Sequence, residues 1–392
     1  MARKLGASAT AVPEIPTLAA VAMDNHAQMY RHKAFPQVRQ GTLYGFALAE
    51  ALVQPAIGPG ESAILALAAL DSGLAYGISG GDRGHAFYFH PAYGVTHLGL
   101  VGTGPVCAAA VVDVGGDEIV GGWREATGGG LFRHTCAVEA GQGLEQFRGA
   151  VTPLLPLAPL PAGEGVVALV GDRGAQAVFG LTQPGGLLFR LDAGQSEIRA
   201  LGRIEAAAPV LVLLPGGRLL GAFAEGQLWQ FDLETGALRA LPAQAPCQMG
   251  KRYVAGVQTL LLSRSGRVYG GTSTDGYLFS YDPTNDAAGE NALTNLGKPV
   301  RQSNIRALAE GHDGRIFGIA EEPGGLAHLF VFDPVQRGFD DLGMVGAAFP
   351  DHWLAHSVGC LSVGPYGEIF LGESDRISHI FIYYPPVAKV RT

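Results

Sequence analysis

Four residues combine proton transfer with anion binding, and each lies in a glycine-flanked polar stretch. His85 and His356 are imidazoles, which exchange a proton near neutral pH. Tyr253 is a phenol that can donate a proton, and Arg252 beside it is a permanent cation that suits a carboxylate. The sequence therefore predicts acid–base chemistry on an acidic substrate, with His85, His356, Tyr253 and Arg252 as catalytic residues.

Other polar and aromatic residues in similar stretches are candidates for holding that substrate. Cations among them suit carboxylates, and indole rings suit the apolar faces of sugars. The predicted substrate-binding residues are Arg83, Trp123, Arg124, Asn304, Trp353 and Arg376.

A metal ion is a further expectation from the same stretches. His352 and Glu373 could contribute to a divalent-ion site at the mouth of a channel, where imidazole favours Zn²⁺ and carboxylate oxygen favours Ca²⁺. The alternative is a channel filled by water, with no cofactor required. The sequence contains no P-loop, no G-x-S-x-G, no H-E-x-x-H and no dinucleotide fingerprint, so common nucleotide and hydrolase sites are not indicated.

A repeat must position these residues. SGRVYGGTSTDGYLFSYDP (265–283) and DGRIFGIAEEPGGLAHLFVFDP (313–334) have the same order of Gly, aromatic, Gly, polar loop and Leu-Phe-x-aromatic-Asp-Pro. Four short segments with period-two alternation recur at intervals of roughly 40 to 60 residues, which is typical of propeller blades and not of helical solenoids. The landmark glycines of the seven copies are Gly77, Gly121, Gly180, Gly221, Gly270, Gly318 and Gly372. The sequence predicts an all-β, seven-bladed β-propeller of four-stranded antiparallel blades.

The two ends of the repeat array indicate how the ring closes. The seventh copy stops after its third strand, HIFIYYPP, and an unassigned strand-like stretch, GTLYGFALAEALV (41–53), precedes the first copy. Pairing this stretch as the outer strand of blade seven would remove two exposed sheet edges. The expected organisation is an N-terminal extension (1–40), one propeller domain (41–386) and a C-terminal tail (387–392).

Propeller topology gathers the candidate residues on one face. Loops that join the second and third strands share that face with loops that enter the innermost strand, and the candidates fall in blades five to seven, one and two. Structural roles are the alternative. His85 aligns with His328 and His379, which could wedge between blades, and Arg252 and Tyr253 could belong to a solvated loop.

Composition excludes several classes of partner. The chain has 27 basic and 35 acidic residues, which argues against nucleic acid or an anionic membrane surface. Its four cysteines contain no C-x-x-C pair, and no apolar run approaches the length that spans a bilayer. Pro13, Glu14 and Pro16 interrupt any signal-like segment, so a cytoplasmic protein and a secreted one with its signal removed both stay open. We expect a monomer.

The blade signature G-R-[IV]-[YF]-G, LF-x-[YF]-DP and a closing LG resembles that of the seven-bladed propeller polysaccharide lyases, which include ulvan lyases and rhamnose–glucuronate lyases. The resemblance covers residues 41–386 at the level of the blade repeat and matches no site residue motif by motif. It implies cleavage of a uronate-containing acidic polysaccharide or oligosaccharide by β-elimination. It also implies His and Tyr as acid–base groups and Arg as the group that neutralises the uronate.

Two other functions remain open at this point. Glycoside hydrolysis needs two carboxylates roughly 5 to 10 Å apart, and Glu321, Glu322, Glu373 and Asp375 make such a pair conceivable. A propeller can also be a non-catalytic carbohydrate- or protein-binding module, since fold alone does not determine function.

Overall fold

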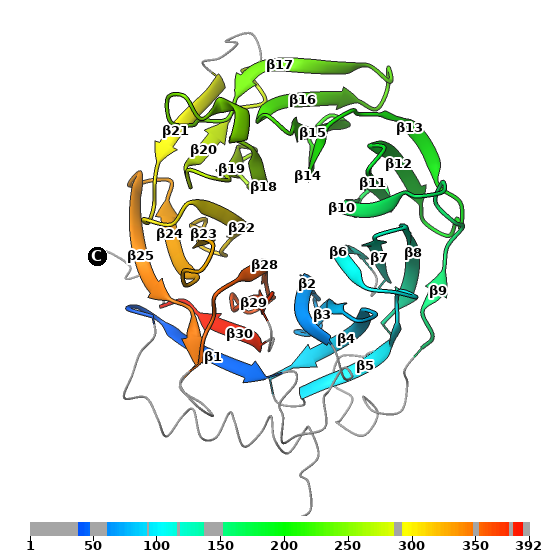
Figure 1. Ribbon diagram of the computed structural model, residues 1–392, viewed down its shortest axis with the longest axis horizontal. Coiled ribbons are helices and arrows are strands. Elements are labelled where there is room, and N and C mark those ends of the chain that lie inside the picture. Colours follow the sequence, from blue (N-terminus) through cyan, green and yellow to red (C-terminus); the bar gives the residue numbers. More distant parts are fainter. Residues whose placement is uncertain are drawn as a thin grey trace, which may run out of the picture.

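Seven four-stranded antiparallel sheets surround a central axis, each with its first strand innermost (Figure 1). This computed structural model describes residues 38–47, 61–91, 94–115, 118–136, 152–285, 292–347, 353–375 and 379–386. The predicted all-β, seven-bladed propeller of four-stranded blades is confirmed.

The blades follow one another along the chain. Blades one to three are β2 (Glu61–Ala69), β3 (Ala75–Gly81), β4 (His85–His90), β5 (Gly94–Leu100); β6 (Val106–Gly115), β7 (Glu118–Glu125), β8 (Gly128–Thr135), β9 (Leu155–Pro156); and β10 (Gly165–Asp172), β11 (Ala177–Gln183), β12 (Leu187–Asp192), β13 (Arg199–Arg203). Blades four and five are β14 (Ala207–Leu214), β15 (Arg218–Phe223), β16 (Gln227–Asp232), β17 (Leu238–Gln244); and β18 (Val257–Leu262), β19 (Val268–Thr272), β20 (Leu278–Tyr281), β21 (Leu293–Gly297).

Blade seven takes its outer strand from the other end of the chain. Blades six and seven are β22 (Asn304–Glu310), β23 (Ile316–Glu321), β24 (His328–Asp333), β25 (Gly338–Met344); and β28 (Val358–Val363), β29 (Ile369–Glu373), β30 (His379–Tyr384), β1 (Thr42–Ala47). A short ribbon of β26 (Gly346–Ala347) and β27 (Trp353–Leu354) lies between them, and one 3-10 helix, η1 (Arg252–Val254), precedes blade five.

Six of the seven landmark glycines are required because an aromatic ring of the third strand covers each of them. A Cβ on Gly270 would lie 2.1 Å from Cζ of its cross-strand partner Phe279, well inside van der Waals contact. The same pairing occurs in Gly77–Phe87, Gly121–Phe132, Gly180–Phe189, Gly221–Trp229 and Gly318–Phe330. Blade seven differs: Leu371 pairs with Phe381, so the equivalent position is Leu371, one residue before the expected Gly372.

The predicted closure of the ring is confirmed. β1 pairs with β30 in register from Thr42↔Tyr384 to Ala47↔His379. The described strand is shorter than the expected 41–53, and residues 48–53 lie outside the described ranges. Val38, within the predicted extension, bridges to Gly343 of blade six and is buried there.

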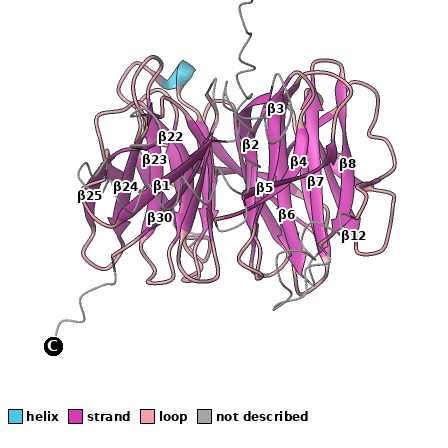
Figure 2. Ribbon diagram, turned by 90° about the horizontal axis from the view of Figure 1, so that it is seen from below, coloured by secondary structure: helices cyan, strands magenta, loops and turns pink. Residues whose placement is uncertain are grey.

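The strand order places the loops that enter the innermost strands and the loops that join the second and third strands on the same face of the disc. Innermost strands begin at this face, and second strands end at it, as the antiparallel pairings require. Figure 2 shows η1 on the same face. We call it the upper face, and it carries the loops that contain the sequence-predicted site residues.

Candidate functional site

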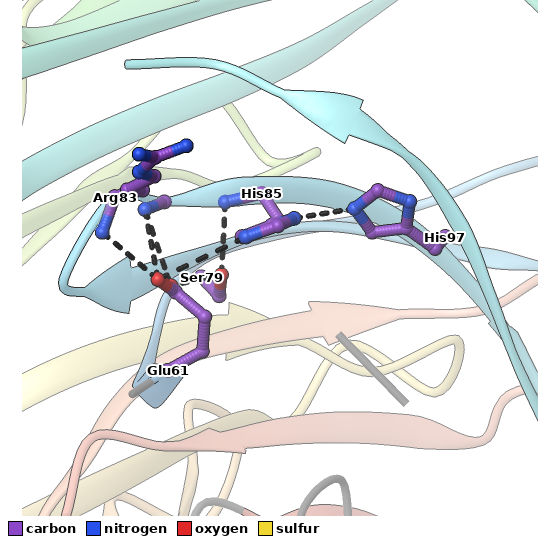
Figure 3. A network of polar contacts seen from close by, with 6 residues as sticks. Glu61, Ser79, Arg83, His85 and His97 are labelled. Atoms are coloured by element: carbon purple, nitrogen blue, oxygen red, sulfur yellow. Dashed lines mark hydrogen bonds and ion pairs between the residues drawn. The ribbon is translucent and has the colours of Figure 1, made fainter. Parts of the chain in front are cut away.

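Glu61 anchors the loop between the second and third strands of blade one (Figure 3). Its carboxylate is buried at the start of β2 and accepts the backbone N–H groups of Arg83, at 2.9 Å, and Gly84, at 3.1 Å. The Ser79 hydroxyl donates to its second oxygen at 2.7 Å. These bonds fix the backbone of the loop immediately before His85.

His85 and His97 form a pair of imidazoles on this anchor. The N–H of His85 donates to Ser79 Oγ at 3.0 Å, and its ring Nδ1 is hydrogen-bonded to Nε2 of His97 on the outer strand β5. The ring centroids are 4.6 Å apart, and His85 Nε2 lies 4.0 Å from the nearer Glu61 oxygen. Both rings are therefore oriented by neighbours from three strands (Figure 3).

Burial sets the protonation state of this pair. It lowers the pKa of both His85 and His97 below the ordinary value of 6.5. For His85, the Glu61 carboxylate opposes this shift, while the charges of His97 and Arg83 add to it. Both rings are then neutral at pH 7, and a neutral imidazole can accept a proton.

Arg83 supplies an exposed cation beside the imidazoles. Its backbone is fixed by Glu61, and its side chain lies at the solvent boundary, close enough for its charge to influence the pKa of His85. Blade one thus places a neutral imidazole beside an exposed cation, and the roles predicted from the sequence for His85 and Arg83 stay predictions.

The candidate residues of blade two, Trp123 and Arg124, lie at the upper end of strand β7. Trp123 Nε1 donates to Glu125 at 3.3 Å, and Glu125 also accepts the N–H of Thr103 at 2.7 Å. Arg124 lies with one guanidinium nitrogen 3.9 Å from Cys107 Sγ. Glu125 therefore anchors the loop that contains Thr103. Of the two candidate residues, Arg124 is the one that Glu125 does not bind, and we consider it the candidate for ligand contact.

Arg252 and Tyr253 lie in η1, before blade five, and blades six and seven separate them from His85 in Figure 1. Arg252 donates to the carbonyl of Ala245 at 2.7 Å, and the neighbouring Lys251 pairs with the buried carboxylate of Asp275 at 3.1 Å. Tyr253 is 81% exposed. These residues share the upper face with His85, but the structure does not bring them together with it.

His356 and Asn304 contact loop backbone. His356 is exposed, and its Nδ1 lies 2.8 Å from the carbonyl oxygen of Gly325, which is on the preceding blade. Asn304 accepts the N–H of Thr274 from the preceding blade at 2.8 Å. Both side chains join adjacent blades at the upper face.

Glu373, the predicted metal ligand, is fully buried and contacts His379. Its carboxylate accepts the backbone N–H of His379 at 3.0 Å and lies 2.6 Å from Nδ1 of the same residue. Within the described ranges, no group of three or more His, Cys, Asp or Glu side chains could hold a metal ion. His352, Arg376 and the side chain of Trp353 lie outside the described residues, so the predictions for them are not tested.

Among the carboxylates with a shifted pKa, Glu321 is one that the sequence had suggested as a candidate. Burial raises the pKa of Glu321, although Arg306, 3.2 Å away, and hydrogen bonds from Ser357 and Val358 act in the opposite direction. The negative charge of Asp375 adds to the rise. Glu321 and Asp375 are two of the four carboxylates that the hydrolase alternative named from the sequence.

Sequence reasoning missed His97 and Glu61. The repeat contained a signal for His97. His97 pairs with Phe87 on the neighbouring strand of blade one, and Asp341 pairs with Phe330 in the same way in blade six. Asp341 contacts His328, just as His97 contacts His85. Aligning the fourth strands as well as the third would have paired both histidines with their partners. Glu61 has a counterpart in Glu164 of blade three, because each accepts a hydroxyl hydrogen bond from the residue 18 positions later, Ser79 or Thr182.

No family model matches the chain, and no curated protein is significantly similar to it. Solved structures do share its fold. Virginiamycin B lyase from Staphylococcus aureus aligns with TM-score 0.62 and 9% identity over 88% of this chain and 99% of its own, and a streptogramin B lyase structure gives 0.61 and 10% over 87% and 98%. The WD40 β-propeller domain of Doa1 gives 0.57 and 13% over 83% and 94%. At such identities the likeness establishes the propeller fold alone.

None of the helices in the described ranges is long and apolar enough to cross a membrane.

Proposed function

We propose that the protein is a polysaccharide lyase that cleaves a uronate-containing glycan by β-elimination at the upper face of blade one. One observation carries the proposal: two imidazoles, both held neutral at pH 7 by burial, contact each other beside the exposed cation Arg83. Elimination needs these groups together, because the proton beside a uronate carboxylate is a very weak acid.

The reaction divides among these side chains as follows. Arg83 binds the uronate carboxylate and stabilises the negative charge that develops as the neighbouring C–H bond breaks. His97, the more exposed imidazole, takes that proton through a ring nitrogen, and His85 orients it by their shared hydrogen bond. A carbon–carbon double bond forms while the bond to the 4-oxygen breaks, and the electron pair leaves with that oxygen. The imidazolium or water then protonates the oxygen, so that atoms and charge balance.

The remaining predicted residues take supporting roles in this proposal. Arg124, on the next blade, and Arg252 with Tyr253, on blade five, contact more distant units of a polymer that lies across the upper face. Tyr253 as the proton donor, as the sequence suggested, would require the polymer to bring its scissile bond to blade five. Glu373 is assigned to loop support and not to a metal, because His379 already occupies its carboxylate.

Two of the structures with a similar fold are named as lyases, virginiamycin B lyase and streptogramin B lyase. Their likeness supports the proposal only in that a propeller of this kind carries lyase activity in those proteins. The choice of a uronate substrate comes from the blade signature and from Arg83.

A binding module is the second candidate, and one observation favours it. The predicted catalytic residues are spread over three blades, and Tyr253, at 81% exposure, has the accessibility of a stacking platform for a sugar ring. Such a dispersed set suits recognition of an extended polymer without cleavage.

The experiment is a comparison of wild type with His97→Gln, His85→Gln and Tyr253→Phe on a panel of uronate polymers. Formation of unsaturated product is followed by ultraviolet absorbance, and circular dichroism checks folding. We expect His97→Gln to lower the rate by about 10² to 10⁴-fold and Tyr253→Phe to change it less than about tenfold. Full activity in His97→Gln would place the site elsewhere. A wild type that binds these polymers without cleaving them would favour the binding module.

A further inference from the structure

A groove on the upper face of blade six carries an unbalanced group of cations. Lys298 and Arg301, in the loop from β21 to β22, line it together with His328 and Asp341. Its volume is about 890 Å³, enough for several sugar units. Arg39 lies at the same place, since it contacts Asp341 at 3.7 Å and its N–H donates to the carbonyl of Leu342.

The cations at this groove outnumber the carboxylates that could neutralise their charge. Asp341 lies 3.7 Å from Arg39 and 3.3 Å from Nδ1 of His328, and it also accepts the N–H of Gly343. Lys298 and Arg301 are exposed, and neither makes an ion pair with any residue in the described part of the chain. The formal net charge of the whole chain is −8, so three permanent cations around one carboxylate are a local exception.

The lining between the cations is apolar. Pro299 and Val300 separate Lys298 from Arg301 along the loop, and both line the groove. Sugar rings present C–H faces that pack on such side chains, while free inorganic anions have no apolar face. A ligand that matches both features has an oxyanion attached to a ring.

We propose that this groove is a binding subsite for an acidic unit of a glycan chain, separate from the imidazole pair on blade one. Lys298 and Arg301 hold the carboxylate or sulfate, and the ring packs on Pro299 and Val300. The choice of a glycan as ligand rests on the proposed function, whereas the site as an anion-binding groove rests on the charges alone.

The site and its catalytic counterpart occupy equivalent positions in the repeat. His328 and Asp341 match His85 and His97 in strand and register, and blade seven lies between their two blades. In blade six the second member of the pair is a carboxylate, so His328 lacks an imidazole partner. The proposed role of blade six, binding of an acidic unit, rests on its cations Lys298 and Arg301 and not on this pair of His328 and Asp341.

The test is affinity electrophoresis and titration calorimetry with polygalacturonate, dextran and inorganic sulfate as probes, at low and at physiological salt. Wild type, the double variant Lys298→Ala/Arg301→Ala, and Arg199→Ala as a matched control are compared. Arg199 is an exposed cation on the outer strand of blade three. We expect the double variant to weaken polygalacturonate binding by about 5- to 30-fold, more at low salt, with dextran unaffected and the control unchanged.

Equal affinity of wild type and double variant for polygalacturonate would overturn the inference. Binding of sulfate with no binding of polygalacturonate would overturn the assignment to a glycan. The proposed lyase is tested separately: if polygalacturonate binds through Lys298 and Arg301 but no uronate polymer gives unsaturated product, elimination fails and the subsite stands.

Discussion

At the scale of single residues, the carboxylates of the upper face serve mainly as acceptors for loop N–H groups. Glu61 accepts two such groups in blade one, and Glu164 accepts the N–H of Gly185 in blade three at 3.2 Å. The hydroxyl of Ser79 also donates to Glu61, and the hydroxyl of Thr182 donates to Glu164. In both blades the glutamate therefore stabilises the conformation of a loop.

Glu373 gives a direct test of this structural role. Glu373→Ala leaves the backbone N–H and the imidazole of the buried His379 without their acceptor, so we expect it to lower the free energy of unfolding by about 2 to 4 kcal/mol. Glu373→Gln retains an acceptor oxygen and should cost less. The measurement is chemical denaturation followed by tryptophan fluorescence, and a neutral Glu373→Ala would refute the role.

The pKa values of the imidazole pair are the second test at this scale. Burial lowers both, so neither ring is charged until the pH falls below 6.5, and the rate of elimination should hold at neutral pH and decline only below that value. The charge of Arg83 contributes to the lowering in His85, so Arg83→Ala should move the His85 titration to higher pH. NMR titration of the imidazole resonances measures this without substrate. A His85 midpoint above 6.5 in wild type would contradict the account.

At the scale of elements, much of a blade could be predicted because its strands follow one packing rule. In six blades a glycine of the second strand lies under an aromatic ring of the third strand, and the polar loop that joins these two strands follows the glycine. Blade seven departs from this rule, because Leu371 pairs with Phe381, and a search for Gly shifted the alignment by one residue.

The contacts of the site were less predictable for a physical reason. His97 meets His85 only because a register shift between Ala86 and Phe87 sets where the outer strand lies against β4. Such an irregularity leaves no mark in the hydrophobic periodicity of one blade, so the contact could be found only by aligning the fourth strands of several blades, where the same shift recurs in blade six. Tyr253 and His85 were expected on one face, which is correct, but sharing a face does not bring residues of separate blades together.

The glycine rule predicts a sharp contrast between two substitutions. Gly270→Ala places a methyl group against the buried ring of Phe279, so we expect the free energy of unfolding to fall by about 1 to 3 kcal/mol. Gly338→Ala is the control, because no heavy atom lies within 4 Å of its added Cβ, and its effect should stay within about 1 kcal/mol of zero. Equal stability of the two variants by denaturant titration would contradict the packing rule.

At the scale of the whole molecule, stability depends on closing the ring with β1. The strand buries Tyr44 and Phe46 in blade seven, and the Phe46 ring contacts Phe89 of blade one with centroids 5.0 Å apart. Its removal therefore exposes the edge of β30 and weakens the junction between the last and first blades.

A chain that lacks residues 1–47 should melt about 10 °C or more below a chain that lacks residues 1–37, because two buried aromatic side chains and a strand pairing are lost. The shorter deletion keeps Val38 and β1 and serves as the matched control. Calorimetric melting curves decide the matter, and coincident curves would mean that the ring does not need this closure.

The central claim, elimination from a uronate glycan, is tested most directly by the masses of the products. An elimination divides the polymer without adding water, so the product masses sum to that of the substrate, and one product carries a new double bond. We predict this result by mass spectrometry for a defined uronate oligosaccharide with wild type, and its absence with His97→Gln. Products whose summed mass is one water heavier would show hydrolysis and contradict the account, as would an uncleaved oligosaccharide across the whole panel of uronates.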